Sequence, residues 1–269
     1  MRKSLHFNSD GKFKIVQFTD TEFSRASEEE TRMKAMMAKI LEAEKPDLAV
    51  YTGDVIASGG SPDPVQAFKD AVSVPEEMQV PWAAVFGNHD SEAPNVTREQ
   101  LHNLQLAHRY CYAQPDPPNV QGTGNYVLEI LGRDHQAAAA LYFLDSGSYS
   151  PLEHLRLGFY DWIRRSQIAW YTETSYRLTV RNGGSPSLPS AFSIFLFPNT
   201  TMFGIFRYVM GKSSTNIAAR HGLTPAFLPP WWKWEISWGP SSDMTTEMTS
   251  GERCMVSVSV TDARPEMPI

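Results

Sequence analysis

Three segments in the N-terminal third of the chain are rich in hydrophobic residues, and each stops at polar or acidic residues. They cover residues 13–18, 47–52 and 80–86. Short apolar runs bounded by turn residues are typical of strands buried on both faces, as in parallel sheets covered by helices. The pattern therefore predicts three buried strands whose carboxyl ends carry polar side chains.

A helical pattern separates the first two segments. Apolar residues from Met33 to Leu41 recur at the spacing of an amphipathic helix, and Pro46 follows them. A strand, a helix and a strand in this order form a right-handed crossover, so the two strands are expected to be parallel neighbours. Their carboxyl ends then emerge at one edge of the sheet, where open α/β sheets hold their ligands.

Five polar side chains follow these strands and form the candidate site: Asp20, Glu22, Asp54, Asn88 and His89. Carboxylate and amide oxygens are ligands for hard divalent cations, and one carboxylate can bridge two of them. An imidazole can donate a proton. The alternative interpretation is that Asn88 and His89 lie in a tight turn and carry no chemistry.

The order and spacing of these residues resemble the calcineurin-like metallophosphoesterases. The resemblance rests on Asp20 with Glu22, on Asp54 after a glycine, and on the Gly-Asn-His-Asp of residues 87–90. It implies an α/β fold, a metallophosphoesterase-type β-sandwich flanked by helices. It also implies a phosphate-ester substrate and two metal ions, Fe, Mn or Zn, with a metal-bound hydroxide as the nucleophile.

The resemblance assigns a role to each residue. Asp20 would ligate the first metal, Asp54 would bridge both, and Asn88 would ligate the second, while His89 would protonate the leaving group or steady the phosphate. Glu22 stands where the family has a histidine, and a carboxylate there would favour harder ions.

Two further segments, residues 141–147 and 160–163, resemble the intracellular purple-acid-phosphatase-like branch of fungi and plants. Asp145 lies in the first of these, and we expect Asp145 and Asp90 to support the metal ligands from behind.

Periodic segments predict the surrounding elements. We expect helices near residues 65–72, 97–110 and 162–177, and a hairpin of strands 126–131 and 139–144. Thr97 is expected to cap its helix, and Ile168 and Trp170 to face the core from theirs. His102 and His108 are expected to be ordinary polar positions.

The sequence changes character near residue 188, which divides the chain into a phosphoesterase part, 1–188, and an atypical or disordered part, 189–269. The later part places Trp beside Pro at 229–234 and lacks both histidine motifs that would complete a site of the family. We expect such a tail not to provide a second sheet, so that apolar strands are left exposed.

A shifted reading frame permits both missing motifs. When the last base of each codon is read with the first two of the next, residues 242–246 permit Gly-His-Asp-His, and residues 191–200 permit Phe-Phe-His-Ile-Pro-Leu-Pro-Glu-Tyr. Both resemble the missing motifs and appear in the right order. We hypothesise that the chain enters a wrong frame between Ser185 and Ala191.

Such a chain keeps about half of the ligands, so we expect weak metal binding and little or no phosphatase activity. Two alternatives are a non-catalytic binding or regulatory remnant that uses the Trp-rich tail, and a non-productive translation product. A serine hydrolase has little support, because residues 145–148 lack the Gly-x-Ser-x-Gly elbow.

The composition limits which binding partners and which cellular location we expect. The chain has 269 residues, 42% of them hydrophobic, and a net charge of -6, which gives no general attraction to nucleic acid or an anionic membrane. Two cysteines cannot form a disulfide framework. No apolar run resembles a signal peptide or a membrane span, so we expect a cytoplasmic protein.

Overall fold

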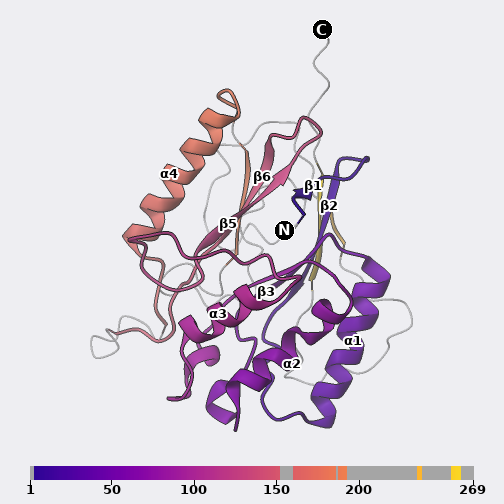
Figure 1. Ribbon diagram of the computed structural model, residues 1–269, viewed down its shortest axis with the longest axis vertical. Helices are drawn as coiled ribbons and strands as arrows, with labels where there is room; N and C mark the ends of the chain where they lie inside the picture. The colour runs from indigo at the N-terminus through magenta and orange to yellow at the C-terminus, as the bar shows by residue number, and fades with distance from the viewer. Residues whose placement is uncertain (1–2, 152–159, 186, 193–234, 238–255, 262–269) are drawn as a thin grey trace, which may run out of the picture.

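The computed structural model describes residues 3–151, 160–185, 187–192, 235–237 and 256–261. Its strands form a five-stranded sheet in the order β4-β3-β2-β9-β8 and a four-stranded sheet in the order β1-β5-β6-β7 (Figure 1). The helices in this part of the chain are too short or too polar to cross a membrane. The strands in chain order are β1 Leu5–His6, β2 Lys12–Phe18, β3 Leu48–Thr52, β4 Trp82–Val85, β5 Tyr126–Leu131, β6 Ala137–Phe143, β7 Leu188–Phe192, β8 Glu235–Ser237 and β9 Val256–Thr261.

The strands β2, β3 and β4 are parallel, as the hydrophobic pattern predicts. Phe18 pairs with Tyr51, and Thr52 pairs with Val85, so the three strands end close to one another. All residues of β3 and β4 are buried, which explains why their sequences are continuously apolar rather than alternating. On the other side of β2, β9 and then β8 continue the sheet in antiparallel order.

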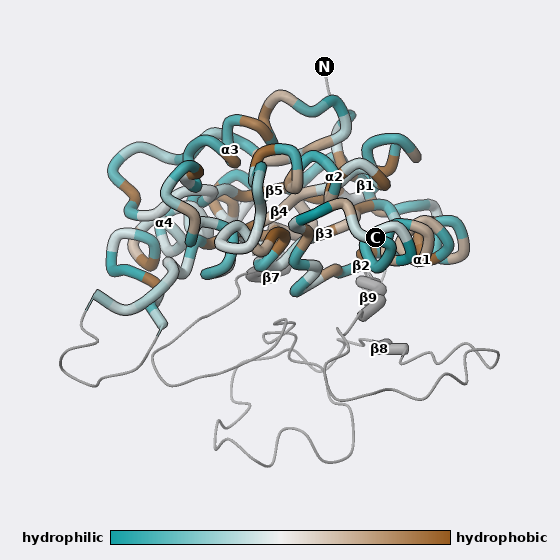
Figure 2. Tube along the Cα trace, turned by 90° about the horizontal axis from the view of Figure 1, so that it is seen from below, coloured by the Kyte–Doolittle hydropathy of each residue, from teal (hydrophilic) through white to brown (hydrophobic). Residues whose placement is uncertain are grey.

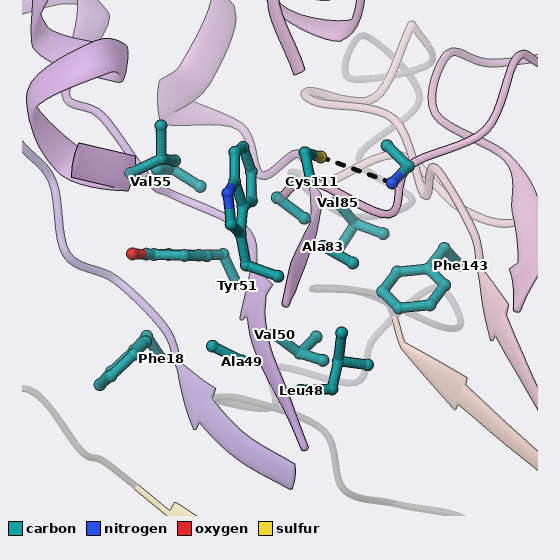
Figure 3. Packing of buried hydrophobic residues seen from close by; sticks show 14 of the residues in the cluster. Phe18, Leu48, Ala49, Val50, Tyr51, Val55, Ala83, Val85, Cys111 and Phe143 are labelled. Atoms are coloured by element: carbon teal, nitrogen blue, oxygen red, sulfur yellow. Dashed lines mark hydrogen bonds between the residues drawn. The ribbon is translucent and has the colours of Figure 1, made fainter. Parts of the chain in front are cut away.

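The two sheets pack face to face around one hydrophobic core. Phe143 of β6 lies beside Ala83 and Val85 of β4 (Figure 3), and all three belong to the same buried cluster. The hydroxyl of Tyr126 on β5 donates a hydrogen bond to the carbonyl oxygen of Ala84 on β4 at 2.9 Å. The predicted β-sandwich is therefore confirmed.

Helices lie on both sides of the sandwich (Figures 1 and 2). The helices that connect the parallel strands, α1 and α2, lie together on one side, and α4 lies on the opposite side, where Leu178 packs against Tyr142 of β6. Thr97 caps α3 in a capping box with Gln100, as predicted. The helices are α1 Glu28–Glu44, α2 Pro64–Glu77, α3 Arg98–Ala107 and α4 Arg165–Arg181, with short 3-10 helices η1 Ser58–Gly60 and η2 His89–Ser91.

Two predictions are wrong. Ile168 is 50% exposed, because α4 begins only at Arg165 and its phase turns Gln167, Thr174 and Leu178 inward instead. The expectation of exposed apolar strands also fails. The second sheet is built mainly from β1 and the β5–β6 hairpin, all within the first 143 residues. In the described part of the chain, the exposed large hydrophobic side chains lie outside the strands.

Glu30 in the first turn of α1 holds the preceding turn in place. Its carboxylate accepts hydrogen bonds from the backbone N–H groups of Ser24, Arg25 and Ala26 at 2.7, 3.0 and 2.8 Å. Burial alone would raise the pKa of Glu30, but these hydrogen bonds outweigh it and lower the pKa below the ordinary value.

We predict that Glu30→Gln lowers the free energy of unfolding by about 1–3 kcal/mol at pH 7. Because the depressed pKa contributes stability only above the unfolded-state pKa of about 4.3, the difference from wild type should narrow as the pH falls below that value. Urea unfolding of both chains at pH 7 measures the loss of stability, and the same experiment at low pH measures how far the difference narrows. The control is Glu29→Gln, an exposed neighbour; an equal loss in both variants, or no narrowing, would contradict the prediction.

Candidate functional site

The candidate site lies where the parallel strands β2, β3 and β4 end. The loops after β2 and β3 run side by side, since the N–H of Asp20 donates to the carbonyl oxygen of Gly53 at 3.2 Å. The N–H of Glu22 likewise donates to the carbonyl oxygen of Asp54 at 2.9 Å. The structure thus brings three of the predicted carboxylates to one edge of the sheet.

The backbone at this edge is strained. Asp20, Glu22 and Asp54 have φ angles of 53°, 47° and 48°, in the left-handed region that residues other than glycine rarely adopt. Such conformations cost free energy and persist where the surrounding structure imposes them, commonly at functional sites. The conformation does not by itself mark a function, because five other described residues outside the candidate set also adopt it: Ala26, Lys45, Gln79, Asn119 and His135.

The loop after β4 joins the same edge. The N–H of His89 donates to Oδ1 of Asp54 at 2.8 Å. Asp90 is fully buried behind it and accepts hydrogen bonds from the N–H of Ile56 at 2.9 Å and of Gly87 at 2.7 Å. Asp90 therefore ties the loops after β3 and β4 together, the position from which it could support the ligands.

The surroundings of Asp54 and Asp90 disfavour the charged form of both carboxyl groups. Burial, together with the nearby Asp20 and Glu22 carboxylates, raises the pKa of Asp54 to about 6, although His89 opposes the shift. Burial and the charge of Asp54 raise the pKa of Asp90 to about 7. A cation at this edge would offset the repulsion.

The donor atoms at this edge have part of what a metal ion requires. Carboxylate oxygens and the amide oxygen of Asn88 suit a hard cation. Within the described ranges, however, no three His, Cys, Asp or Glu side chains are grouped so that they could hold a metal ion. The chemistry of the residues thus fits a cation, but the set at this edge is incomplete.

Two residues near His89 were not anticipated from the sequence. The Nδ1 atom of His89 lies 3.0 Å from Oε2 of Glu92, and the hydroxyl of Tyr149 makes a short hydrogen bond to Oε1 of the same carboxylate. Burial would lower the pKa of His89, but the hydrogen bond and charge of Glu92 and the charge of Asp54 raise it. The one local signal was the spacing of Glu92, three residues after His89.

Asp145 lies behind the site in a nearly buried ion pair with Arg98, whose side chain is only 10% exposed. The guanidinium also donates to the carbonyl oxygens of Gly87 at 2.7 Å and Gly147 at 2.8 Å. Arg98 thereby fixes the loop after β4 against the loop after β6. The structure places Asp145 where a supporting residue would lie, and Arg98 is the partner that sequence reasoning missed.

The described contacts of the two histidines of the α3 region lie elsewhere. Nε2 of His102 lies 3.0 Å from the carbonyl oxygen of Gln114, and the ring of His108 packs on Trp82.

Comparison with known proteins agrees with this geometry. Residues 13–190 match the family described as calcineurin-like phosphoesterase. The chain belongs to this family.

Relatives from two organisms are similar to the chain. Probable inactive purple acid phosphatases 29 and 14 of Arabidopsis thaliana are 33% and 32% identical over 69% and 65% of the chain, which cover 53% and 49% of those proteins. Phosphatase DCR2 of Saccharomyces cerevisiae is 33% identical over 61% of the chain and 31% of its own length. The chain thus spans about half or less of these curated relatives.

We predict that Arg98→Ala lowers the free energy of unfolding by about 3–5 kcal/mol, because it leaves the Asp145 carboxylate buried without its partner. Arg177→Ala provides the control, since Arg177 and Glu173 form an exposed pair and its loss should cost less than about 1 kcal/mol. Chemical denaturation of the two variants measures the difference. Similar losses in both would show that the Arg98 pair does not hold the loops together.

Proposed function

We propose that this edge of the sheet is a site for metal-dependent hydrolysis of phosphoric esters. The observation that carries the proposal is the convergence of the Asp20, Glu22 and Asp54 loops with the loop of Asn88 and His89. Membership of the calcineurin-like phosphoesterase family supports the same chemistry.

The proposed site has metal-binding residues and one proton donor. Asp20, Glu22, Asp54 and Asn88 would hold metal ions through their side-chain oxygens. When bound, such ions neutralise the charge of a phosphate group and make its phosphorus more open to attack. Because Glu92 lies at Nδ1 of His89, the imidazolium form of His89 is the one that could pass a proton, from Nε2, to the leaving-group oxygen.

We further propose that this polypeptide is a weak or inactive form. The incomplete donor set among the described residues supports this view, as does the absence of the two later histidine motifs from the sequence. The family match ends at residue 190, close to the proposed change of reading frame. The same incomplete set also favours a second candidate function, a non-catalytic remnant that binds a partner.

We predict that the present chain binds Mn²⁺ at least about 100-fold more weakly than a version whose reading frame is restored after Leu188, and that only the restored version hydrolyses an aryl phosphate at a useful rate. Calorimetry with Mn²⁺ and a phosphatase assay with Mn²⁺, Fe²⁺ or Zn²⁺ measure both properties.

The control is Asp54→Asn in the restored version, which removes the proposed bridging carboxylate and should abolish turnover. Equal activity of the present and restored chains would contradict the proposed defect. Activity that survives Asp54→Asn would contradict the proposed site.

A further inference from the structure

Asn88 is the candidate ligand whose orientation matters most, because its side chain ends in an oxygen and a nitrogen and only the oxygen can bind a cation. An amide oxygen can donate an electron pair to a cation or accept a hydrogen bond, whereas the amide NH₂ group donates hydrogen bonds and repels a cation. The two ends of the amide have nearly the same shape, so packing alone does not decide which end faces the site. The orientation of the amide must therefore be set by a hydrogen bond to a neighbouring group.

The orientation is set by hydrogen bonds that run from Asn88 through Tyr149 to Glu92. Asn88 and Glu92 lie in the segment after β4, and Tyr149 lies in the loop after β6. Ionised Glu92 can only accept hydrogen bonds, so the hydroxyl of Tyr149 must donate to its Oε1. The Tyr149 oxygen is then left as an acceptor. Nδ2 of Asn88 lies 3.0 Å from this oxygen and is the only end of the amide that can donate to it.

This arrangement leaves the amide oxygen of Asn88 directed away from Tyr149. Asn88 is only 3% exposed, which limits its other orientations, and none of the residues with described contacts donates a hydrogen bond to its Oδ1. The other oxygen of Glu92, Oε2, lies 3.0 Å from Nδ1 of His89 and favours the imidazole tautomer protonated there. One carboxylate therefore orients two neighbouring residues of the site.

We propose that Tyr149, held by Glu92, is a positioning residue that turns the Asn88 amide so that its oxygen is presented to a cation. The proposal rests on the proposed function at this edge. Neither Tyr149 nor Glu92 would touch the substrate or the metal in this role. Tyr149 belongs to the loop after β6, so its hydrogen bonds to Asn88 and Glu92 also connect that loop to the segment after β4.

Mn²⁺ binding by the full 269-residue chain tests the proposal. Tyr149→Phe keeps the ring and removes the acceptor oxygen, and it should weaken Mn²⁺ binding by about 10-fold or more. The matched control is Tyr176→Phe, whose side chain is 69% exposed on α4 and should leave binding unchanged. In an Asn88→Ala background, Tyr149→Phe should have no further effect, because the residue that it positions is gone. Wild-type affinity in Tyr149→Phe, or additive losses in the double variant, would overturn the proposal.

A second measurement needs neither metal nor activity. In nuclear magnetic resonance spectra of the metal-free chain, the Nδ2 protons of Asn88 should show an Overhauser contact to the ring of Tyr149. At alkaline pH, ¹⁵N-labelled His89 of the wild-type chain should carry its proton on Nδ1. In Glu92→Ala the proton should move toward Nε2, whereas in the control Glu173→Gln it should stay on Nδ1.

The two measurements separate the possible failures. If the wild-type chain binds no Mn²⁺ while the Overhauser contact and the tautomer are as expected, the positioning stands, and the metal function fails if the restored version also binds none. If the contact is missing, or if His89 keeps its tautomer in Glu92→Ala, the positioning fails whatever the metal result.

Discussion

The burial of Asp54 among other carboxylates, at the carboxyl edge of the parallel strands, is the constraint on which the site depends. The register of β2 and β3 forces the loops of Asp20, Glu22 and Asp54 together, and Asp54 is buried there with a raised pKa. Burial and the neighbouring carboxylates disfavour the ionised form of Asp54 unless a cation joins them. The positive φ angles of the same three residues add a backbone cost. A bound cation would offset the first of these costs, which is the physical reason for proposing a binding site here.

The surrounding structure holds this edge in place through buried polar groups. Asp90 joins the loops after β3 and β4, and Arg98 joins the loops after β4 and β6. Tyr149 and Glu92 add a connection that reaches Asn88 and His89 directly. Buried networks of this kind stabilise only when every member has its partner, so the loss of one member should loosen more than one loop.

The sequence was sufficient to predict the parts of the fold that have local or periodic signals. The apolar runs predicted β2, β3 and β4, and their shared direction predicted that the loops after them meet at one edge. Thr97 was predicted as a cap from its position alone. The inward face of α4 was not predicted, because two of its three buried residues, Gln167 and Thr174, are polar, while the apolar Ile168 points to solvent. The ion pair of Arg98 with Asp145 and the bond of Tyr149 to Glu92 join residues 47 and 57 positions apart, and no local pattern marks such contacts.

The most direct test of the central claim is where a paramagnetic cation binds on this chain. Mn²⁺ added in small amounts to the ¹⁵N-labelled protein broadens the amide signals nearest to it. Broadening should begin at residues 20–22, 53–54 and 88–89 and should disappear from them in Asp54→Asn. If broadening begins instead at another acidic surface, such as the first turn of α1 with Glu28 and Glu29, the edge of the sheet is not the metal site.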